Sequence, residues 1–201
     1  MPFLNTPIQI ASLLPAATEI VHALGATDRL ISRSHECDWP TEVTGLPALT
    51  APRIDASRSS RAIDERVKES AGEPLFELDE PLLARLAPDL ILTQAACRVC
   101  AIDADAVVTA AARISLPGGR QPRVLTLSPQ SLAELFTDIH RVGTAIGCEH
   151  QATQAVAHLQ ARREAVETKA SEAVRAAGHR PRVAIIEWLD PPMAAGNWVP
   201  E

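Results

Sequence analysis

The residues Ser-His-Glu-Cys-Asp-Trp-Pro at positions 34–40 bring together more reactive side chains than an ordinary surface loop carries. Within them His35 and Cys37 are two positions apart, and farther along the chain Cys97 and Cys100 have Cys-x-x-Cys spacing. Imidazole nitrogen and thiolate sulfur are ligands for zinc, and four of them suit its tetrahedral geometry. We therefore treat His35, Cys37, Cys97 and Cys100 as a candidate metal site.

Two other interpretations of the Cys-x-x-Cys pair remain open. Cys97 and Cys100 can be small buried hydrophobes beneath a loop, because free cysteine is among the most buried residue types. A redox pair needs a helix N-terminus that lowers a thiol pKa, and a predicted helix begins close by, near Asp103. The His-x-Cys and Cys-x-x-Cys segments also lie too far apart to form a standard zinc ribbon.

Composition limits the classes of protein that this chain can be. It has 201 residues, 46% of them hydrophobic and 22% charged, which is enough for one sizeable core and one or two domains. Its net charge is -6, and no Lys/Arg cluster predicts a nucleic-acid partner. The sequence has neither a G-x-G-x-x-G motif nor a P-loop, so no nucleotide-binding motif is found. It also has no G-x-S-x-G motif and no recognisable Ser-His-Asp arrangement that would predict an enzyme.

The first twenty residues do not read as a secretion signal. They lack a basic start, and Pro7 and Gln9 interrupt the apolar stretch. No segment reaches the roughly 18 apolar residues that a membrane span needs. We expect a cytoplasmic chain as written, or a periplasmic one if the start site is wrong.

Strand and helix patterns alternate through residue 147, which predicts an α/β fold with a Rossmann-like parallel sheet. We expect helix caps at Ser60, Asp79 and Ser128, and a helix stop at Gly147. Residues 41–60 look like a loop. The predicted strands are 8–15, 29–34, 75–78, 89–93, 123–127 and 182–188, and the predicted helices are 16–26, 60–70, 79–87, 103–114, 128–147 and 149–177.

The last of these helices has a narrow, Ala-rich apolar stripe and no Gly or Pro. We expect it to lie along a globular body, with a two-stranded coiled coil as the alternative. The predicted domains are a Rossmann-like lobe at 1–148, a rigid linking helix at 149–178, and the first strand and loop of a second lobe at 179–201. We expect that lobe to continue beyond Glu201.

In an open parallel sheet, ligands bind outside the carboxyl ends of the strands. The loops at 13–19, 34–40 and 93–100 all follow predicted strands, so strand polarity predicts that they share one rim. Trp39 lies in a Pro-flanked loop where core packing is poor. An exposed aromatic at such a rim is typical of a site for a flat ligand.

Four segments in this order resemble the cobalamin-binding proteins among the ABC-transporter substrate-binding proteins, whose two lobes are joined by one rigid helix. They are SLLPAATEIVHALGATDRL, SHECDWP, PDLILTQAACRVCAI and, after the long helix, EWLDPPMAAGNWVPE. The resemblance covers nearly the whole chain. It implies two Rossmann-like lobes with a corrinoid between them, captured without chemical conversion and delivered to an ABC permease.

The resemblance also implies the binding residues. The segment 15–18 would line the cleft floor, and 38–40 matches the Ser-Asp-Tyr-Pro-like loop that meets the corrin, with Trp39 in place of Tyr. The full expected ligand-binding set is Pro15, Ala16, Ala17, Thr18, His35, Asp38, Trp39, Pro40, Trp188 and Trp198.

Asp103 and Asp105 fall near the position of an acid that pairs with permease arginines in these proteins, and helix capping is the alternative role for both. The chain departs from the family pattern by adding Cys37, Cys97 and Cys100 and by lacking a secretion signal. His35 and the cysteines could ligate the cobalt of a corrinoid or a separate metal ion. The alternative function is an intracellular metal- or thiol-dependent protein that uses this cluster.

Overall fold

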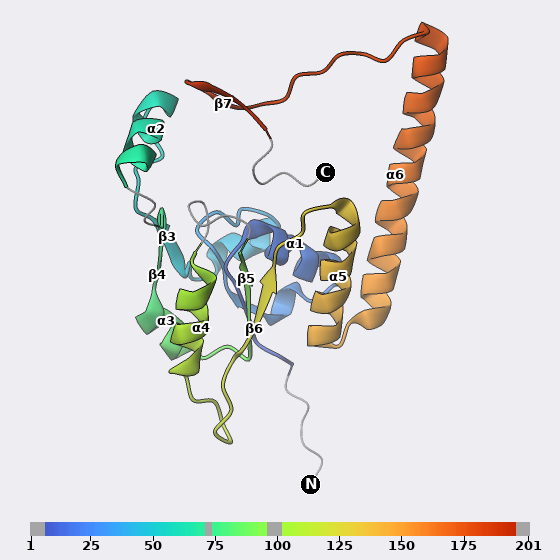
Figure 1. Ribbon diagram of the computed structural model, residues 1–201. Helices are drawn as coiled ribbons and strands as arrows, with labels where there is room; N and C mark the ends of the chain where they lie inside the picture. The colour runs from blue at the N-terminus through green and yellow to red at the C-terminus, as the bar shows by residue number, and fades with distance from the viewer. Residues whose placement is uncertain (1–6, 71–73, 96–101, 196–201) are drawn as a thin grey trace.

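Four parallel strands form the centre of the first lobe in the computed structural model, which describes residues 7–70, 74–95 and 102–195 (Figure 1). They are β1 (Ile10–Ser12), β2 (Leu30–Ser32), β5 (Leu90–Gln94) and β6 (Arg123–Leu127), in the order β2-β1-β5-β6. All three pairings are parallel. The predicted α/β fold with a parallel Rossmann-like sheet is confirmed.

The sheet separates two hydrophobic cores because successive strand residues face opposite sides. Ile10 packs with α1 (Pro15–Ala23) and α5 (Leu132–Ile146) on one face. Its neighbour Ala11 packs with α3 (Glu80–Leu86) and α4 (Ala104–Ala112) on the other. The two central strands, β1 and β5, are buried on both faces, which is why they read as mainly apolar runs in the sequence.

Two of the predicted helix caps are displaced by one and three residues. Helix α2 (Ser60–Glu69) is capped by Ser59, and α5 is capped by Ser131 instead of Ser128. Ser131 Oγ accepts from Glu134 N at 3.2 Å, and Glu134 Oε2 accepts from Gln130 N at 2.8 Å. This reciprocal pairing satisfies two helix-terminal donors, as in a capping box, so the helix starts there.

The other predicted helix signals are confirmed. Asp79 caps α3 by accepting from Leu82 N at 2.8 Å. Pro15 begins α1, and Gly25 follows its end with φ of 70°. Gly147 caps α5 with the same φ of 70°. A residue with a Cβ would be strained in this left-handed conformation.

The segment predicted as a loop at 41–60 contains two short elements instead. Helix η2 (Thr41–Gly45) and strand β3 (Thr50–Pro52) lie within it, and a further one-turn helix, η1 (Thr27–Arg29), precedes β2. Strand β3 pairs antiparallel with β4 (Phe76–Leu78) in a separate two-stranded sheet that leads to α2 (Figure 1). Three-residue strands are too short to show a period in sequence.

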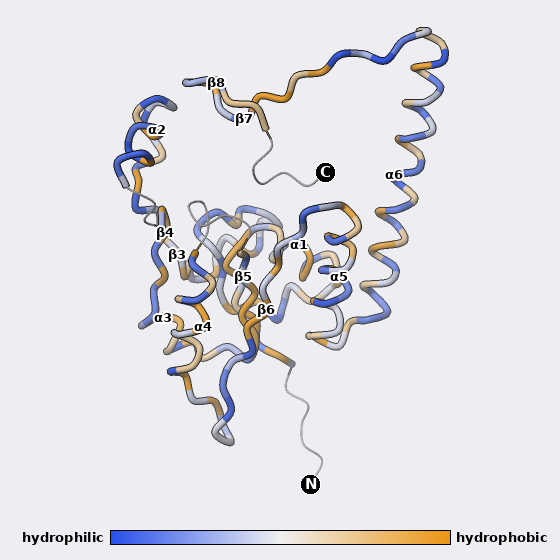
Figure 2. The backbone as a smooth tube through the Cα atoms, viewed as in Figure 1, coloured by the Kyte–Doolittle hydropathy of each residue, from blue (hydrophilic) through white to orange (hydrophobic). Residues whose placement is uncertain are grey.

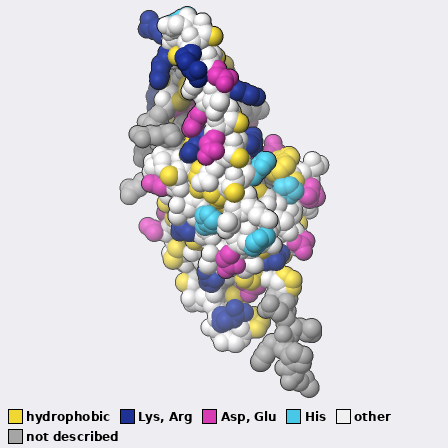
Figure 3. Space-filling model, turned by 90° about the vertical axis from the view of Figure 1, so that its right-hand side faces the viewer, with side chains coloured by type: hydrophobic (Ala, Val, Ile, Leu, Met, Phe, Trp, Pro, Cys, Tyr) yellow, Lys and Arg dark blue, Asp and Glu magenta, His cyan; other side chains and the backbone are white. Residues whose placement is uncertain are grey.

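Helix α6 (Glu149–Ala177) has the predicted bounds but only partly the predicted packing. Its buried residues are Ala152 and Val156, both near its start, and farther along Val166 is 66% exposed. The expectation that it lies along a globular body therefore holds only for its first turns. Lys and Arg side chains gather toward its far end (Figure 3), which keeps that part solvated.

Among the described residues, no helix is both long and apolar enough to cross a membrane.

After α6 the chain forms a hairpin of β7 (Ile186–Leu189) and β8 (Pro192–Ala194). The strand expected at 182–188 is shorter than predicted, and the segment expected to be a loop supplies its antiparallel partner. Hydrophobic residues occur along this part of the chain (Figure 2), and the side chains of Val183 and Leu189 are 78% and 77% exposed. The expected division into a lobe at 1–148, a linking helix at 149–178 and the start of a second lobe at 179–201 stays a prediction.

The contact between α5 and α6 depends on Gly143. A Cβ at this position would lie 2.6 Å from Ala152 Cβ and 3.1 Å from Cys148 O. Gly143→Ala should gain about 1 kcal/mol of helix propensity and lose about 1–3 kcal/mol to overpacking. We expect a net loss in the free energy of unfolding, measured by urea denaturation. In the control Gly45→Ala the new Cβ meets nothing within 4 Å, and a Gly143→Ala variant as stable as wild type would contradict this packing.

Candidate functional site

Parts of all three predicted rim loops meet at the carboxyl edge of the sheet. They line a small cavity of about 20 Å³, room for about one water molecule. Residues that follow β1 and β2 form much of the lining, and Gln94 closes it from β5. The remaining wall comes from Thr50 of β3, Phe76 of β4 and Ile102, which precedes α4. The lining residues are Leu13, Leu14, Pro15, Ser34, His35, Glu36, Thr50, Phe76, Gln94 and Ile102.

His35 is held against this cavity by two neighbours. Thr50 Oγ1 lies 2.6 Å from ring Nδ1 and accepts from the His35 backbone N–H at 3.0 Å. The Phe76 ring is tilted against the imidazole with centroids 5.0 Å apart. Burial lowers the pKa of His35 below its ordinary 6.5, nearby Arg33 lowers it further, and Glu36 opposes both.

The backbone around His35 is anchored by Arg33. Its guanidinium donates to Ser34 O at 2.9 Å and to His35 O at 3.2 Å, and it reaches Thr44 O at 3.3 Å. The Arg33 backbone N–H donates to Pro47 O at 3.0 Å, and its carbonyl accepts from Leu49 N at 2.9 Å. These two bonds bring the next residue, Thr50, beside His35. Neither Arg33 nor Thr50 is predicted from the sequence, because neither belongs to a chemical motif and their partners come from a segment that is distant in the chain.

Cys37 faces away from His35 and into the core. It is 1% exposed, and its Sγ lies 3.1 Å from Thr18 Oγ1. Burial raises the pKa of its thiol above the ordinary 9.0, although hydrogen bonds from Thr18 and Ser34 oppose the shift. Within the described residues no three or more His, Cys, Asp or Glu side chains form a metal-binding group. Cys97 and Cys100 lie outside the described residues, so the four-ligand site stays a prediction.

Only part of the segment 15–18 is accessible. Pro15 lines the cavity and Ala16 is exposed, whereas Ala17 and Thr18 are both fully buried. Positions 14, 17, 18 and 21 share one helical face, and α1 turns that face to the core. The expectation that Ala17 and Thr18 line a cleft floor needs this correction, because Thr18 instead bonds to Ser12 Oγ at 2.9 Å.

Trp39 lies outside the small cavity and is 51% exposed. Its ring meets His22 edge-on, with centroids 4.6 Å apart and planes at 81°. His22 also contacts Thr27 Oγ1 at 2.9 Å, and Thr27 and Glu42 line an open hollow of about 460 Å³. Asp38 is exposed and Pro40 is buried. Trp39 is thus exposed, as expected for a rim aromatic, and its contact with a ligand stays a prediction.

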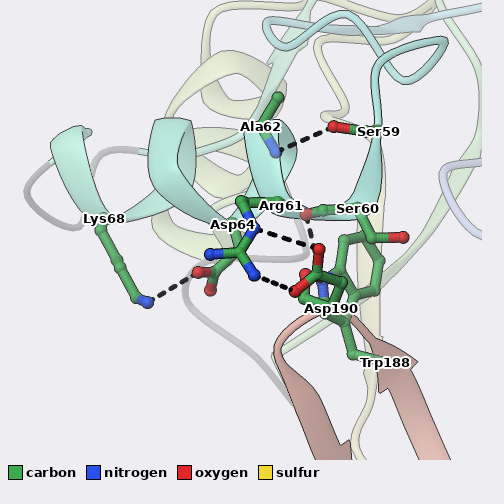
Figure 4. A network of polar contacts seen from close by, with 8 residues as sticks. All are labelled: Ser59, Ser60, Arg61, Ala62, Asp64, Lys68, Trp188 and Asp190. Atoms are coloured by element: carbon green, nitrogen blue, oxygen red, sulfur yellow. Dashed lines mark hydrogen bonds and ion pairs between the residues drawn. The ribbon is translucent and has the colours of Figure 1, made fainter.

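Trp188 contacts the first lobe. Its indole Nε1 donates to Ser60 O at 3.2 Å and to Asp190 O at 3.0 Å. Arg61 forms a two-bond pair with Asp190, at 2.7 and 3.1 Å (Figure 4). We call Ser60, Arg61, Trp188 and Asp190 the hairpin clasp, because together they attach the β7–β8 hairpin to α2. Trp198 lies outside the described residues.

The two acids at 103 and 105 open helix α4. Asp103 is its N-cap and accepts from Asp105 N at 3.1 Å. Both side chains are exposed. The capping role is therefore present for Asp103, and it leaves the carboxylates accessible, so a contact with permease arginines stays a prediction.

The sequence of this chain matches one protein family. A family model described as periplasmic binding protein matches residues 10–199. The chain belongs to this family. Among curated proteins, none matches it significantly.

Solved structures of the family share the fold. A periplasmic heme-binding protein from Pseudomonas aeruginosa has a TM-score of 0.62 at 18% identity, covering 90% of this chain and 52% of its own. The vitamin B12-binding protein BtuF of Vibrio cholerae has a TM-score of 0.57 at 17% identity, covering 82% and 51%. The heme-binding protein RhuT of Roseiflexus sp. RS-1 has a TM-score of 0.60 at 21% identity, covering 90% and 55%. This chain thus spans about half the length of these proteins, and identities this low show the fold alone.

The buried thiol of Cys37 predicts a pH effect on stability. The unfolded thiol ionises near pH 9.0, whereas the folded thiol keeps its proton to higher pH, so the folded state binds more protons there. The free energy of unfolding should be unaffected by this group below pH 9 and fall as pH rises above 9. Cys37→Ala should be less stable at pH 7 but show a flatter decline between pH 9 and 10.5 in urea denaturation. Parallel declines in the two proteins would rule out this assignment.

The hairpin clasp predicts a local change. Arg61→Gln removes both bonds to Asp190, and because the pair is exposed the free energy of unfolding should change by about 1 kcal/mol or less. Amide hydrogen exchange in residues 186–194 should nevertheless become faster. Arg66→Gln is the matched control, since Arg66 pairs at 3.2 Å with Glu69 of the same helix. Equal exchange in both variants would show that the clasp does not hold the hairpin.

Proposed function

We propose that this chain provides one lobe and the linking helix of a substrate-binding protein that captures a corrinoid of the cobalamin type for an ABC-type permease. The observation that carries the proposal is the convergence of the β1, β2 and β5 loops at one sheet edge, with His35 in the cavity wall. This is the edge at which open α/β sheets bind ligands. Membership of a family of binding proteins supports capture without chemical conversion.

The size of the cavity determines how such a ligand would sit. A space of about 20 Å³ is far too small to enclose a corrin ring. A flat ligand would instead lie across the rim, with Pro15 and His35 beneath it and Trp39 at one side. The opposite wall would come from a second lobe, whose beginning we assign to residues 179–201.

Heme is a second candidate ligand. Two of the three similar structures described above are named as heme-binding proteins and one as a vitamin B12-binding protein. Both ligands are flat macrocycles around a metal, so the same imidazole and aromatic groups could serve either. The motif resemblance favours the corrinoid, and the ligand test includes both.

The alternative of an intracellular thiol-dependent protein has less support. The thiol of Cys37 is buried, contacts Thr18 and is protonated at neutral pH. Reactive cysteines are instead accessible and have lowered pKa values. Membership of the periplasmic binding protein family likewise favours the periplasmic over the cytoplasmic expectation. We keep Asp103 and Asp105 as the proposed permease contact, because both are exposed at a helix start.

Ligand titration followed by tryptophan fluorescence tests this function. Cyanocobalamin or hemin should quench the emission of the purified chain saturably. Trp39→Ala should weaken the binding of the preferred ligand about 2- to 10-fold, corresponding to the 0.5–1.5 kcal/mol of an aromatic stacking contact. The control Val166→Ala alters a side chain that is 66% exposed on α6 and should leave affinity unchanged. If neither ligand binds saturably, the proposed function is wrong.

A further inference from the structure

The hydroxyl group of Thr50 sits between three hydrogen-bonding atoms. It donates to Ser34 Oγ at 3.1 Å, accepts from the His35 backbone N–H at 3.0 Å, and contacts His35 Nδ1 at 2.6 Å. Thr50 is 5% exposed and Ser34 is 4% exposed, so water competes little for these bonds. The network is therefore a fixed part of the cavity wall.

Counting the protons of this network assigns the state of the imidazole. A threonine hydroxyl has one hydrogen and two lone pairs. Two arrangements use each hydrogen once: Thr50 donates to Ser34 Oγ and accepts from Nδ1–H, or Ser34 donates to Thr50, which then donates to an unprotonated Nδ1. The geometry favours Thr50 as the donor to Ser34 Oγ. In that arrangement the short contact is a bond from Nδ1–H to Thr50, and the lone pair of the neutral ring is on Nε2.

That lone pair is available at the cavity. Among the described residues Nε2 has no hydrogen-bond partner, and the nearest carboxylate oxygen, Glu36 Oε1, is 3.9 Å away. The His35 side chain is 22% exposed, and Phe76 supports the ring from one side. An accessible nitrogen lone pair on an oriented ring is what a metal ligand requires, and a hydrogen bond at the other nitrogen is its usual support.

The surroundings also limit the kind of metal. The described residues contain no group of three or more potential ligands, and Cys37 is turned into the core. Within the part of the chain that the structure describes, no second imidazole or thiolate accompanies His35 at the cavity, and one imidazole is a poor site for a free ion. It suits a metal that already has its equatorial ligands from a macrocycle and needs a single axial one.

We propose that Thr50 is a positioning residue that holds His35 as the Nδ1–H tautomer, so that Nε2 becomes the axial ligand of the metal in a bound metallomacrocycle. This rests on the proposed function and assigns a single ligating atom within the His/Cys cluster. With aquocobalamin the step is a ligand exchange. The Nε2 lone pair forms a bond to Co(III), the cobalt–water bond breaks, water leaves, and no oxidation state changes.

The tautomer is tested first in the ligand-free chain. Long-range ¹H–¹⁵N NMR at pH 8 distinguishes Nδ1–H from Nε2–H, and His35→Gln identifies the resonance. We expect Nδ1–H in wild type and in Thr50→Ser, which keeps the hydroxyl. Thr50→Val has nearly the same shape without the hydroxyl and should lose the preference. An Nε2–H tautomer in wild type would overturn the proposal.

Ligation is tested with two cobalamins. Aquocobalamin can exchange its water for Nε2, whereas the cyanide of cyanocobalamin blocks that position. Wild type and Thr50→Ser should show a visible spectral shift with aquocobalamin that is absent in His35→Gln. Thr50→Val should weaken the shifted complex about 10- to 100-fold, as for other residues that support metal ligands. Because cyanide blocks the axial position, cyanocobalamin affinity, followed by fluorescence quenching, should differ much less between Thr50→Val and Thr50→Ser than aquocobalamin affinity does.

The two ligands separate the failure of this inference from that of the proposed function. Cyanocobalamin binding without a His35-dependent aquocobalamin shift would overturn axial ligation and leave corrinoid capture intact. A shift of equal affinity in Thr50→Val and Thr50→Ser would overturn the role of Thr50. If wild type binds neither cobalamin, both corrinoid capture and its ligation by His35 are wrong.

Discussion

The parallel pairing of β1 with β2 and with β5 is the constraint on which the rest of the lobe depends. Because all four strands run in one direction, every loop that leaves a strand end emerges at the same edge. That places Pro15, His35 and Gln94, which are far apart in the sequence, around one small cavity. The pairing needs both faces of the sheet covered, and the two cores formed by α1 with α5 and α3 with α4 cover them.

Beneath that edge, two sets of polar side chains bond to one another. Ser12, Thr18 and Cys37 form one set of contacts, and Ser34, Thr50 and His35 form another. The two sets give neighbouring parts of one loop opposite roles. Cys37 is buried as a protonated core residue, whereas His35 lies at the cavity, where its Nε2 has no hydrogen-bond partner among the described residues.

Helix α6 packs on the lobe only near its start, and the hairpin clasp attaches the chain to the lobe again at residues 188–190. The helix is buried against α5 only at Ala152 and Val156. Past its far end the chain returns, and the Arg61–Asp190 pair attaches the hairpin to α2 (Figures 1 and 4). An exposed ion pair contributes little to overall stability, so the clasp acts on the position of the hairpin rather than on the fold.

The sequence alone was sufficient for features that depend on neighbours within about four residues or on strand direction. These include the α/β alternation, the Asp79 cap, the glycine stop at Gly147, the bounds of α6 and the shared rim of the loops at 13–19 and 34–40. Hydrophobic periodicity and capping chemistry are local, and loop convergence follows from polarity once a parallel sheet is expected.

Only the tertiary structure decided which side chains of those loops face the cavity. The turn after β2 sends His35 to the rim and Cys37 to the core, although both look equally reactive in the sequence. Thr50 carries no motif, and it reaches His35 because β3 crosses beside the loop. Burial and hydrogen-bond partners of this kind arise from packing between distant segments, and the order of residues does not encode them locally.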